Sequence, residues 1–182
     1  MGHFSQWLSP NKQIPLESIH TLVFNRSDRL GDAVITLPFM VATIAHLRTL
    51  GWQGEVVIIA SPLNEPILAP LGEIAGTTVI VHRSNQTYEY ERSIIMVLWH
   101  ILLFTRAHFK RVLDRSRNTT LLVDFVDSIS ELSFDLYSQY PKAYWISANR
   151  GIFTPFFDYT LFERFSGNTR LQLIDSCTLL ME

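Results

Sequence analysis

Residues 22–39 of this 182-residue chain read LVFNRSDRLGDAVITLPF, and they predict a strand, a turn and a helix in that order. The apolar residues 22–24 are typical of a buried strand in a parallel sheet. Polar residues 25–31 form the turn, and a long apolar stretch with helical periodicity begins at Asp32. Because open α/β sheets bind ligands where strands end and helices begin, we expect a ligand site here.

The predicted turn carries groups that suit acid–base chemistry. Asp32 lies in the first turn of the helix, where free N–H groups and the helix dipole favour an ionised carboxylate. Arg26 and Arg29 would add to that preference. Gly31 can adopt a positive φ or let a ligand approach the backbone. Asp32 is then suited to accept a proton from a sugar hydroxyl, unless it is only a capping residue behind a surface loop.

The run RLGDAVITLP resembles the amino-terminal motif of the lipopolysaccharide heptosyltransferases, glycosyltransferase family 9. Members of that family have an apolar strand, an (R/S)xGD turn and an apolar helix carrying TLP or ALP. The matching positions here are Arg29, Leu30, Gly31, Asp32, Thr36, Leu37 and Pro38. The resemblance implies that Asp32 is the catalytic base.

Strand-like and helix-like patterns alternate along the rest of the chain. Strands are expected at 55–60, 77–81, 121–126 and 142–147, and helices at 32–50, 61–72, 88–114 and 171–181. This alternation predicts an α/β fold, a Rossmann-like doubly wound parallel sheet with right-handed crossovers. By the resemblance, it corresponds to the N-terminal half of a GT-B glycosyltransferase. We expect an irregular lead-in over residues 1–18 and an acceptor-binding domain over 19–182, with the C-terminal donor domain absent.

Composition narrows the classes of partner. The net charge is −2, which gives no overall attraction to nucleic acid, so we expect no nucleic-acid partner and only local anion recognition. Cys177 is the single cysteine, and this favours a reducing, cytoplasmic location. No cluster of metal ligands and no dinucleotide-binding glycine motif is present, so no metal and no cofactor is predicted.

Further candidate contacts follow the later strands. Asp127 and Ser128 come after the strand 121–126, whose pattern resembles a VIDLQG-like strand of the family with Asp124 at the aspartate. The chain departs from that pattern at residues 126 and 127. Asp127 and Ser128 either border the cleft or, with Glu131, form a capping box for the next helix. Arg150 is a weaker candidate for acceptor binding. The substrate-binding residues predicted in total are Arg26, Arg29, Gly31, Asp127, Ser128 and Arg150.

A basic stretch over residues 106–117 offers a different kind of contact. It contains Arg106, Lys110, Arg111, Arg115 and Arg117. The stretch is either a solvated helix face or a surface for phosphorylated headgroups. The resemblance implies an anionic glycolipid or saccharide acceptor at the inner face of the cytoplasmic membrane, which the chain would contact through 106–117. It also implies a nucleotide-sugar donor, typically ADP-heptose, held by a missing domain or a partner chain.

Two functions follow from these patterns. The first is a heptosyltransferase-like domain that transfers sugar with inversion from a nucleotide-sugar to an anionic lipopolysaccharide-core-like acceptor, and that is inactive without a donor-binding half. The second is a non-catalytic module that binds an anionic saccharide or lipid headgroup. A flavodoxin-like signalling domain is disfavoured, because Asp28 and Asp32 lie near arginines rather than in an acidic cluster.

Overall fold

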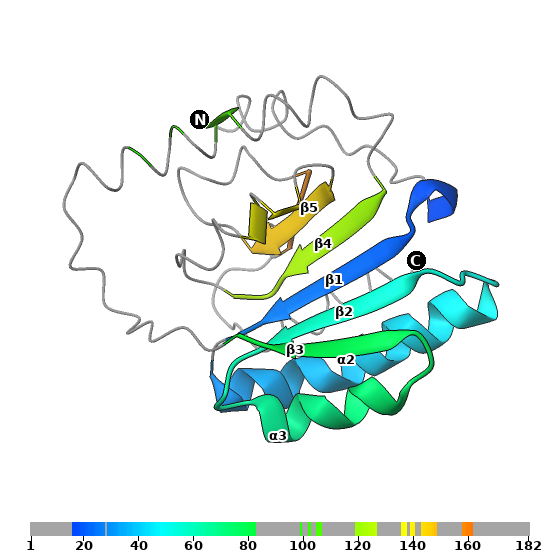
Figure 1. Ribbon diagram of the computed structural model, residues 1–182, viewed down its shortest axis with the longest axis vertical. Helices are drawn as coiled ribbons and strands as arrows, with labels where there is room; N and C mark the ends of the chain where they lie inside the picture. Colours follow the sequence, from blue (N-terminus) through cyan, green and yellow to red (C-terminus); the bar gives the residue numbers. More distant parts are fainter. Residues whose placement is uncertain are drawn as a thin grey trace.

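The computed structural model describes residues 16–27, 29–82, 99, 102, 105–106, 119–126, 136–137, 139–140, 143–148 and 158–161. The strands are β1 (Thr21–Arg26), β2 (Glu55–Ala60), β3 (Thr77–Val81), β4 (Thr120–Asp124), β5 (Ala143–Ala148) and β6 (Tyr159–Leu161). The helical segments are η1 (Leu16–Ser18), α2 (Leu30–Thr49), α3 (Glu65–Leu68) and η2 (Ala69–Glu73). Figure 1 shows the strands side by side, with α2 and α3 along β1, β2 and β3.

The six strands form one parallel sheet in the order β3-β2-β1-β4-β5-β6. This is the strand order of doubly wound dinucleotide-binding folds, and it reverses direction between β1 and β4. β1 is central: Phe24 lies opposite Ile58 of β2 on one side and Val123 of β4 on the other. The predicted parallel α/β fold class is therefore confirmed, and its reversal point lies at the first strand.

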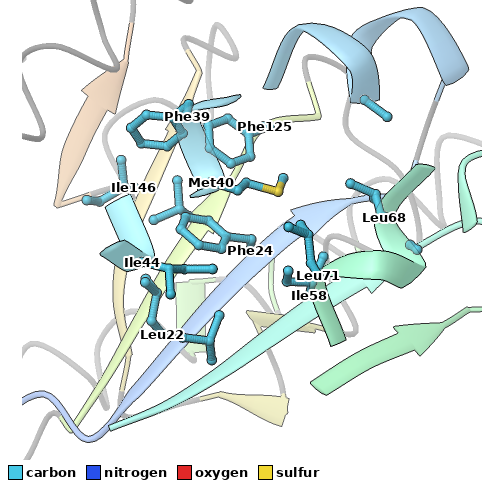
Figure 2. Close-up of a cluster of buried hydrophobic side chains, with 14 of the residues drawn as sticks. Leu22, Phe24, Phe39, Met40, Ile44, Ile58, Leu68, Leu71, Phe125 and Ile146 are labelled. Carbon is cyan, nitrogen blue, oxygen red and sulfur yellow. The ribbon is translucent and has the colours of Figure 1, made fainter. Parts of the chain in front are cut away.

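One face of the sheet packs against α2. Leu22 and Phe24 of β1 meet Phe39, Met40 and Ile44 of that helix in a continuous buried cluster, drawn in Figure 2. The ring of Phe125, just after β4, stacks on Phe24 with centroids 5.8 Å apart. This cluster fixes where α2 begins relative to the ends of β1 and β4.

The opposite face of the sheet is also covered. Val23 and Leu122 belong to a second buried cluster that contains Trp145 of β5. Tyr137 packs on Trp145 with ring centroids 4.5 Å apart. Burial on both faces explains why the strands read as continuous apolar runs rather than alternating ones.

The helix α2 ends in a Schellman motif. The N–H of Trp52 bonds to the carbonyl oxygen of Leu47 (3.0 Å), and the N–H of Gly51 bonds to that of Arg48 (3.0 Å). Gly51 has a φ of 80°, a conformation that glycine adopts without steric cost. The Arg48 guanidinium then donates to the carbonyl oxygens of Trp52 and Gly54, which fastens the helix end to the start of β2. The predicted end of this helix at Gly51 is confirmed.

By length and composition, α2 is apolar enough to cross a membrane, with a mean hydropathy of 1.6. In the structure it packs on the sheet through its own residues Ala33, Met40 and Ile44, which are buried. Its other side exposes Leu30 and Val34.

Several element boundaries differ from the sequence prediction. The first strand continues through Arg26 and α2 starts at Leu30, so the turn is shorter than the predicted 25–31. The second predicted helix begins at Glu65 instead of Ser61, because the Asn64 side chain accepts the Ser61 N–H (2.8 Å) and holds a turn. β2 and β3 have the predicted bounds, while β4 and β5 are shifted by one or two residues. β6 was not predicted as a strand.

Of the predicted helix 88–114, the structure describes residues 99, 102, 105 and 106, and these are helical. The predicted helix 171–181 lies outside the described residues. Of the irregular lead-in 1–18, the described residues 16–18 form one 3₁₀ turn. The division into a lead-in and one domain over 19–182 stays a prediction.

Candidate functional site

The carboxyl ends of β1 and β4 and the beginning of α2 meet at the reversal point of the sheet. This is the position at which open α/β sheets bind their ligands. The β1–β4 ladder continues beyond β4, because the Phe125 N–H donates to the Asn25 carbonyl oxygen (3.1 Å). Arg26 therefore emerges from β1 directly beside Phe125.

Arg26 is buried at this point. Its side chain is 3 % exposed, and one guanidinium nitrogen, Nη2, lies 3.0 Å from Oδ2 of Asp32. The other nitrogen, Nη1, donates to the carbonyl oxygen of Phe125. The Arg26 carbonyl oxygen in turn accepts from the Asn64 side chain (2.6 Å). Arg26 thus connects the ends of two strands to the start of α2.

Asp32 is accessible from solvent. Its side chain is 39 % exposed, and it lies in the first turn of α2, where backbone N–H groups have no helical partner. Its backbone carbonyl accepts from the Thr36 hydroxyl (2.9 Å). Among the described residues, the carboxylate forms an ion pair with Arg26 through Oδ2. Because 39 % of the side chain is exposed, the carboxylate can meet a solute.

Two other predicted site residues surround Asp32. Arg29 is exposed at the N-cap of α2, with an extended backbone and no capping bond from its side chain. Gly31 is exposed as well, and a Cβ built on it would meet nothing within 4 Å. Gly31 lies inside the helix and has no positive φ, so of the two uses expected for it, close approach of a ligand is the one that remains. The structure thus brings Arg26, Arg29, Gly31 and Asp32 together.

The burial of Arg26 corrects the expectation that it binds substrate. A side chain that is 3 % exposed, with its guanidinium occupied by Asp32 and Phe125, presents no surface to an acceptor. Arg26 pairs with Ala60 of β2 on one side, and its side chain bonds to Phe125 just after β4 on the other, so it is buried near the centre of the sheet. Arg29 is the arginine of the predicted pair that faces solvent.

Beneath the site, a buried polar cluster joins β1 to β4. The Asp124 carboxylate accepts from the Asn25 side chain (2.9 Å), the Val126 N–H (3.1 Å) and the Tyr137 hydroxyl (3.0 Å). Asp124 is fully buried. It belongs to the framework below the crevice, and its burial prevents contact with a ligand at the surface.

Sequence reasoning missed two supports of the site. Asn64 holds the end of β1, and its signal is weak, because an asparagine after Ser-Pro marks a turn without naming its partner. The carbonyl oxygen of Phe125 carries no side-chain signal at all. Asp127, Ser128 and Arg150 lie outside the described residues. Within the described part of the chain, no group of three or more potential metal ligands comes together.

A groove at the opposite edge of the sheet is a separate feature. The loop 50–55 lines it together with Glu17, Ile19 and His20. It lies at the amino ends of β1 and β2, whereas Asp32 lies beyond the carboxyl end of β1. The indole N–H of Trp52 donates to the Ile19 carbonyl oxygen (2.6 Å) at its base. Its position opposite the strand ends makes it the weaker candidate for chemistry.

No family model and no curated protein sequence matches this chain. One solved structure is similar to it: the crystal structure of the glycosyl transferase family 9 from Veillonella parvula DSM 2008, with a TM-score of 0.53. The chain shares its fold with part of that structure. The match covers 93 % of this chain and 43 % of that structure, at 12 % sequence identity.

The resemblance expected from the RLGDAVITLP motif is therefore confirmed at the level of the fold. The chain spans less than half of its structural neighbour. At 12 % identity the match carries the arrangement of the strands and helices, and the chemistry of the site has to be argued from its own residues.

Proposed function

We propose that this chain is the acceptor-binding part of a heptosyltransferase-like glycosyltransferase in which Asp32 is the general base. The observation that carries the proposal is an accessible carboxylate in the first turn of α2, held by Arg26 at the reversal point of the sheet. The likeness to a family 9 glycosyltransferase fold supports it.

In the proposed reaction, Asp32 takes the proton of an acceptor hydroxyl. The electron pair of that oxygen forms the new bond to the anomeric carbon of the donor sugar. The bond from this carbon to the diphosphate oxygen breaks, its electron pair leaves with the nucleoside diphosphate, and the configuration inverts. Stabilising the leaving charge falls to the donor-binding half, supplied by further chain or by a partner.

The proposed donor is a nucleotide-sugar of the ADP-heptose type, and the proposed acceptor is an anionic glycolipid of the lipopolysaccharide-core type. Arg29, exposed beside Asp32, is placed to attract such an acceptor. We place the reaction in the cytoplasm at the inner face of the membrane, with contact through the basic stretch 106–117. Of that stretch, Arg106 is described, and it is helical and exposed.

The test combines this chain with a separately expressed donor-binding half of a family 9 enzyme, ADP-heptose and a phosphorylated core acceptor that lacks heptose. Mass spectrometry follows the product, and calorimetry follows acceptor binding to the chain alone. Asp32→Asn should lower transfer by about 10²- to 10⁴-fold, the range typical of a lost general base, and leave acceptor binding within about threefold.

The matched control is Glu73→Gln, which removes an exposed carboxylate at the end of η2. This variant should transfer sugar like the unaltered chain. Equal rates for Asp32→Asn and Glu73→Gln would show that Asp32 is not the base.

A non-catalytic module that binds an anionic saccharide or lipid headgroup is the second candidate. It predicts acceptor binding without transfer under every combination of donor half and donor sugar. Asp32→Asn would then change binding alone.

A further inference from the structure

Arg26 has no direct part in the proposed reaction, yet it holds the group that does. Its guanidinium is buried between the Asp32 carboxylate and the Phe125 carbonyl oxygen. Burying a cation is costly unless it is paired and hydrogen-bonded, so the contacts with these two acceptors offset the cost of burying Arg26. The position is thus fixed from both sides.

The backbone around Arg26 is fixed as well. Asn64 binds the Arg26 carbonyl oxygen, and Asn25, one residue earlier, is bonded to Asp124 of β4. The Phe125 ring, whose residue supplies the second acceptor, packs between Phe24 and Phe39 with centroid distances of 5.8 Å and 5.4 Å. The arginine therefore projects from a rigid strand end toward α2.

The ion pair with Arg26 involves only one of the two carboxylate oxygens of Asp32. Nη2 of Arg26 engages Oδ2, while Oδ1 has no donor among the described residues. A carboxylate held by one oxygen keeps a defined direction for the other. A general base needs that direction, because misplacement by about 1 Å can cost about 10²-fold in rate.

We propose that Arg26 is a positioning residue for sugar transfer: it holds Asp32 through Oδ2 so that Oδ1 meets the acceptor hydroxyl. This inference rests on the proposed function of Asp32. It differs from a purely structural role, in which Arg26 would only fasten α2 to the ends of β1 and β4. The two roles predict different kinetics.

The test compares Arg26→Gln, Arg26→Lys and Arg48→Gln in the reconstituted transfer assay. Arg48 is the matched control, because it also fastens α2 by donating to backbone carbonyl oxygens, and it does so at the far end of the helix. For each variant, kcat and the KM for the acceptor are measured beside the midpoint of urea unfolding.

Positioning predicts that Arg26→Gln lowers kcat by about 10²-fold and changes the acceptor KM by less than about threefold. Arg26→Lys keeps the charge and loses the planar fork, so it should recover part of kcat, to within about tenfold of the unaltered chain. Arg48→Gln should lower the unfolding midpoint and leave kcat unchanged. If Arg26→Gln does not fold, Arg26→Lys decides: a reduced kcat supports positioning, and a native kcat overturns it.

The outcomes separate the two proposals. Transfer by the unaltered chain with an unchanged kcat in a folded Arg26→Gln variant overturns positioning and leaves Asp32 as the base. A loss of kcat in Arg48→Gln equal to that in Arg26→Gln overturns it too, since stability would then explain both. No transfer by the unaltered chain overturns the proposed function, and the positioning role with it.

A double-mutant cycle gives a readout that needs no activity. Arg26→Gln, Asp32→Asn and the double variant are unfolded in urea. Positioning predicts coupling, with the second substitution shifting the midpoint less when the first is already present. Additive shifts would show that Arg26 does not hold Asp32 in solution.

Discussion

Gly54 occupies a space that admits no side chain. A Cβ there would lie 2.1 Å from a ring carbon of Trp52 and 2.6 Å from the carbonyl oxygen of His20. Trp52 cannot move away easily, because it is buried, hydrogen-bonded to Ile19 and covered by the Arg48 guanidinium, 5.0 Å from the ring centroid. The residue is therefore fixed by packing at the start of β2.

Gly54→Ala is expected to lower the free energy of unfolding by about 1–3 kcal/mol, the usual cost of overpacking. Urea denaturation followed by tryptophan fluorescence measures it. Gly31→Ala is the matched control: its Cβ meets nothing within 4 Å, and alanine favours helix, so stability should stay level or rise by up to about 1 kcal/mol. Equal losses in both variants would contradict the packing explanation.

The buried cluster at Asp124 depends on a single side chain in the same way. Asp124→Ala would leave the donors of Asn25, Val126 and Tyr137 without their acceptor. Each unsatisfied buried donor costs about 1–3 kcal/mol, so we expect the free energy of unfolding to fall by about 3 kcal/mol or more.

Tyr137→Phe serves as the comparison for Asp124, since it removes one of these bonds together with its donor and should cost about 1 kcal/mol. Thermal and urea unfolding of both variants give the values. A loss in Asp124→Ala no larger than in Tyr137→Phe would mean that the cluster does not join β1 to β4 as described.

At the scale of elements, Tyr140, which packs against the second face of the sheet, makes the stability of the fold depend on pH. Burial raises the pKa of the Tyr140 hydroxyl above its usual 10.0, and the charge of Glu55 raises it further. The unfolded chain therefore loses this proton at lower pH than the folded chain. The contribution to stability is fully present below about pH 10 and declines as the pH rises through the ordinary value toward the raised one.

We expect the free energy of unfolding to decrease between pH 9.5 and 11, with a shallower decrease in Tyr140→Phe. Urea midpoints at three pH values across that interval (about 9.5, 10.3 and 11) measure the slope. The variant retains every other tyrosine, so the difference in slope isolates Tyr140. Identical slopes would show that the folded state does not raise its pKa.

Elements differ in how far the sequence alone predicts them. β2 and β3 are apolar, β-branched runs bounded by turn residues, and their bounds follow from these local signals. The extension of β1 through Asn25 and Arg26 does not, because those polar residues are buried by partners on β4. β6 is three residues long and pairs at the edge of β5, too short for a periodic pattern.

The site divides along the same line. The strand, the turn and the position of Asp32 in the first turn of α2 follow from the order of residues 22–39. The burial of Arg26 could not be predicted, because its acceptor is a backbone carbonyl 99 positions later. Local patterns thus located Asp32, the candidate base, while the burial of Arg26 depends on the tertiary fold.

At the scale of the whole molecule, the chain spans less than half of its structural neighbour. The match covers 43 % of that structure. Asp32, the proposed base, lies in the first turn of α2 at the reversal point of the sheet. Acceptor binding and deprotonation belong to the proposed role of this chain, whereas donor binding lies beyond it. Reconstitution with a donor-binding half is for that reason the decisive experiment for the proposed function.

The central place of β1 in the sheet has a consequence for biosynthesis. β1, β2 and β3 are synthesised before β4, with which the other side of β1 pairs. The hydrogen-bond acceptor of the Asn25 side chain, Asp124, follows 99 residues later. Until then the nascent chain carries an open, apolar strand edge, which invites aggregation. Arrested translation before residue 119 should yield a polypeptide that chaperones retain.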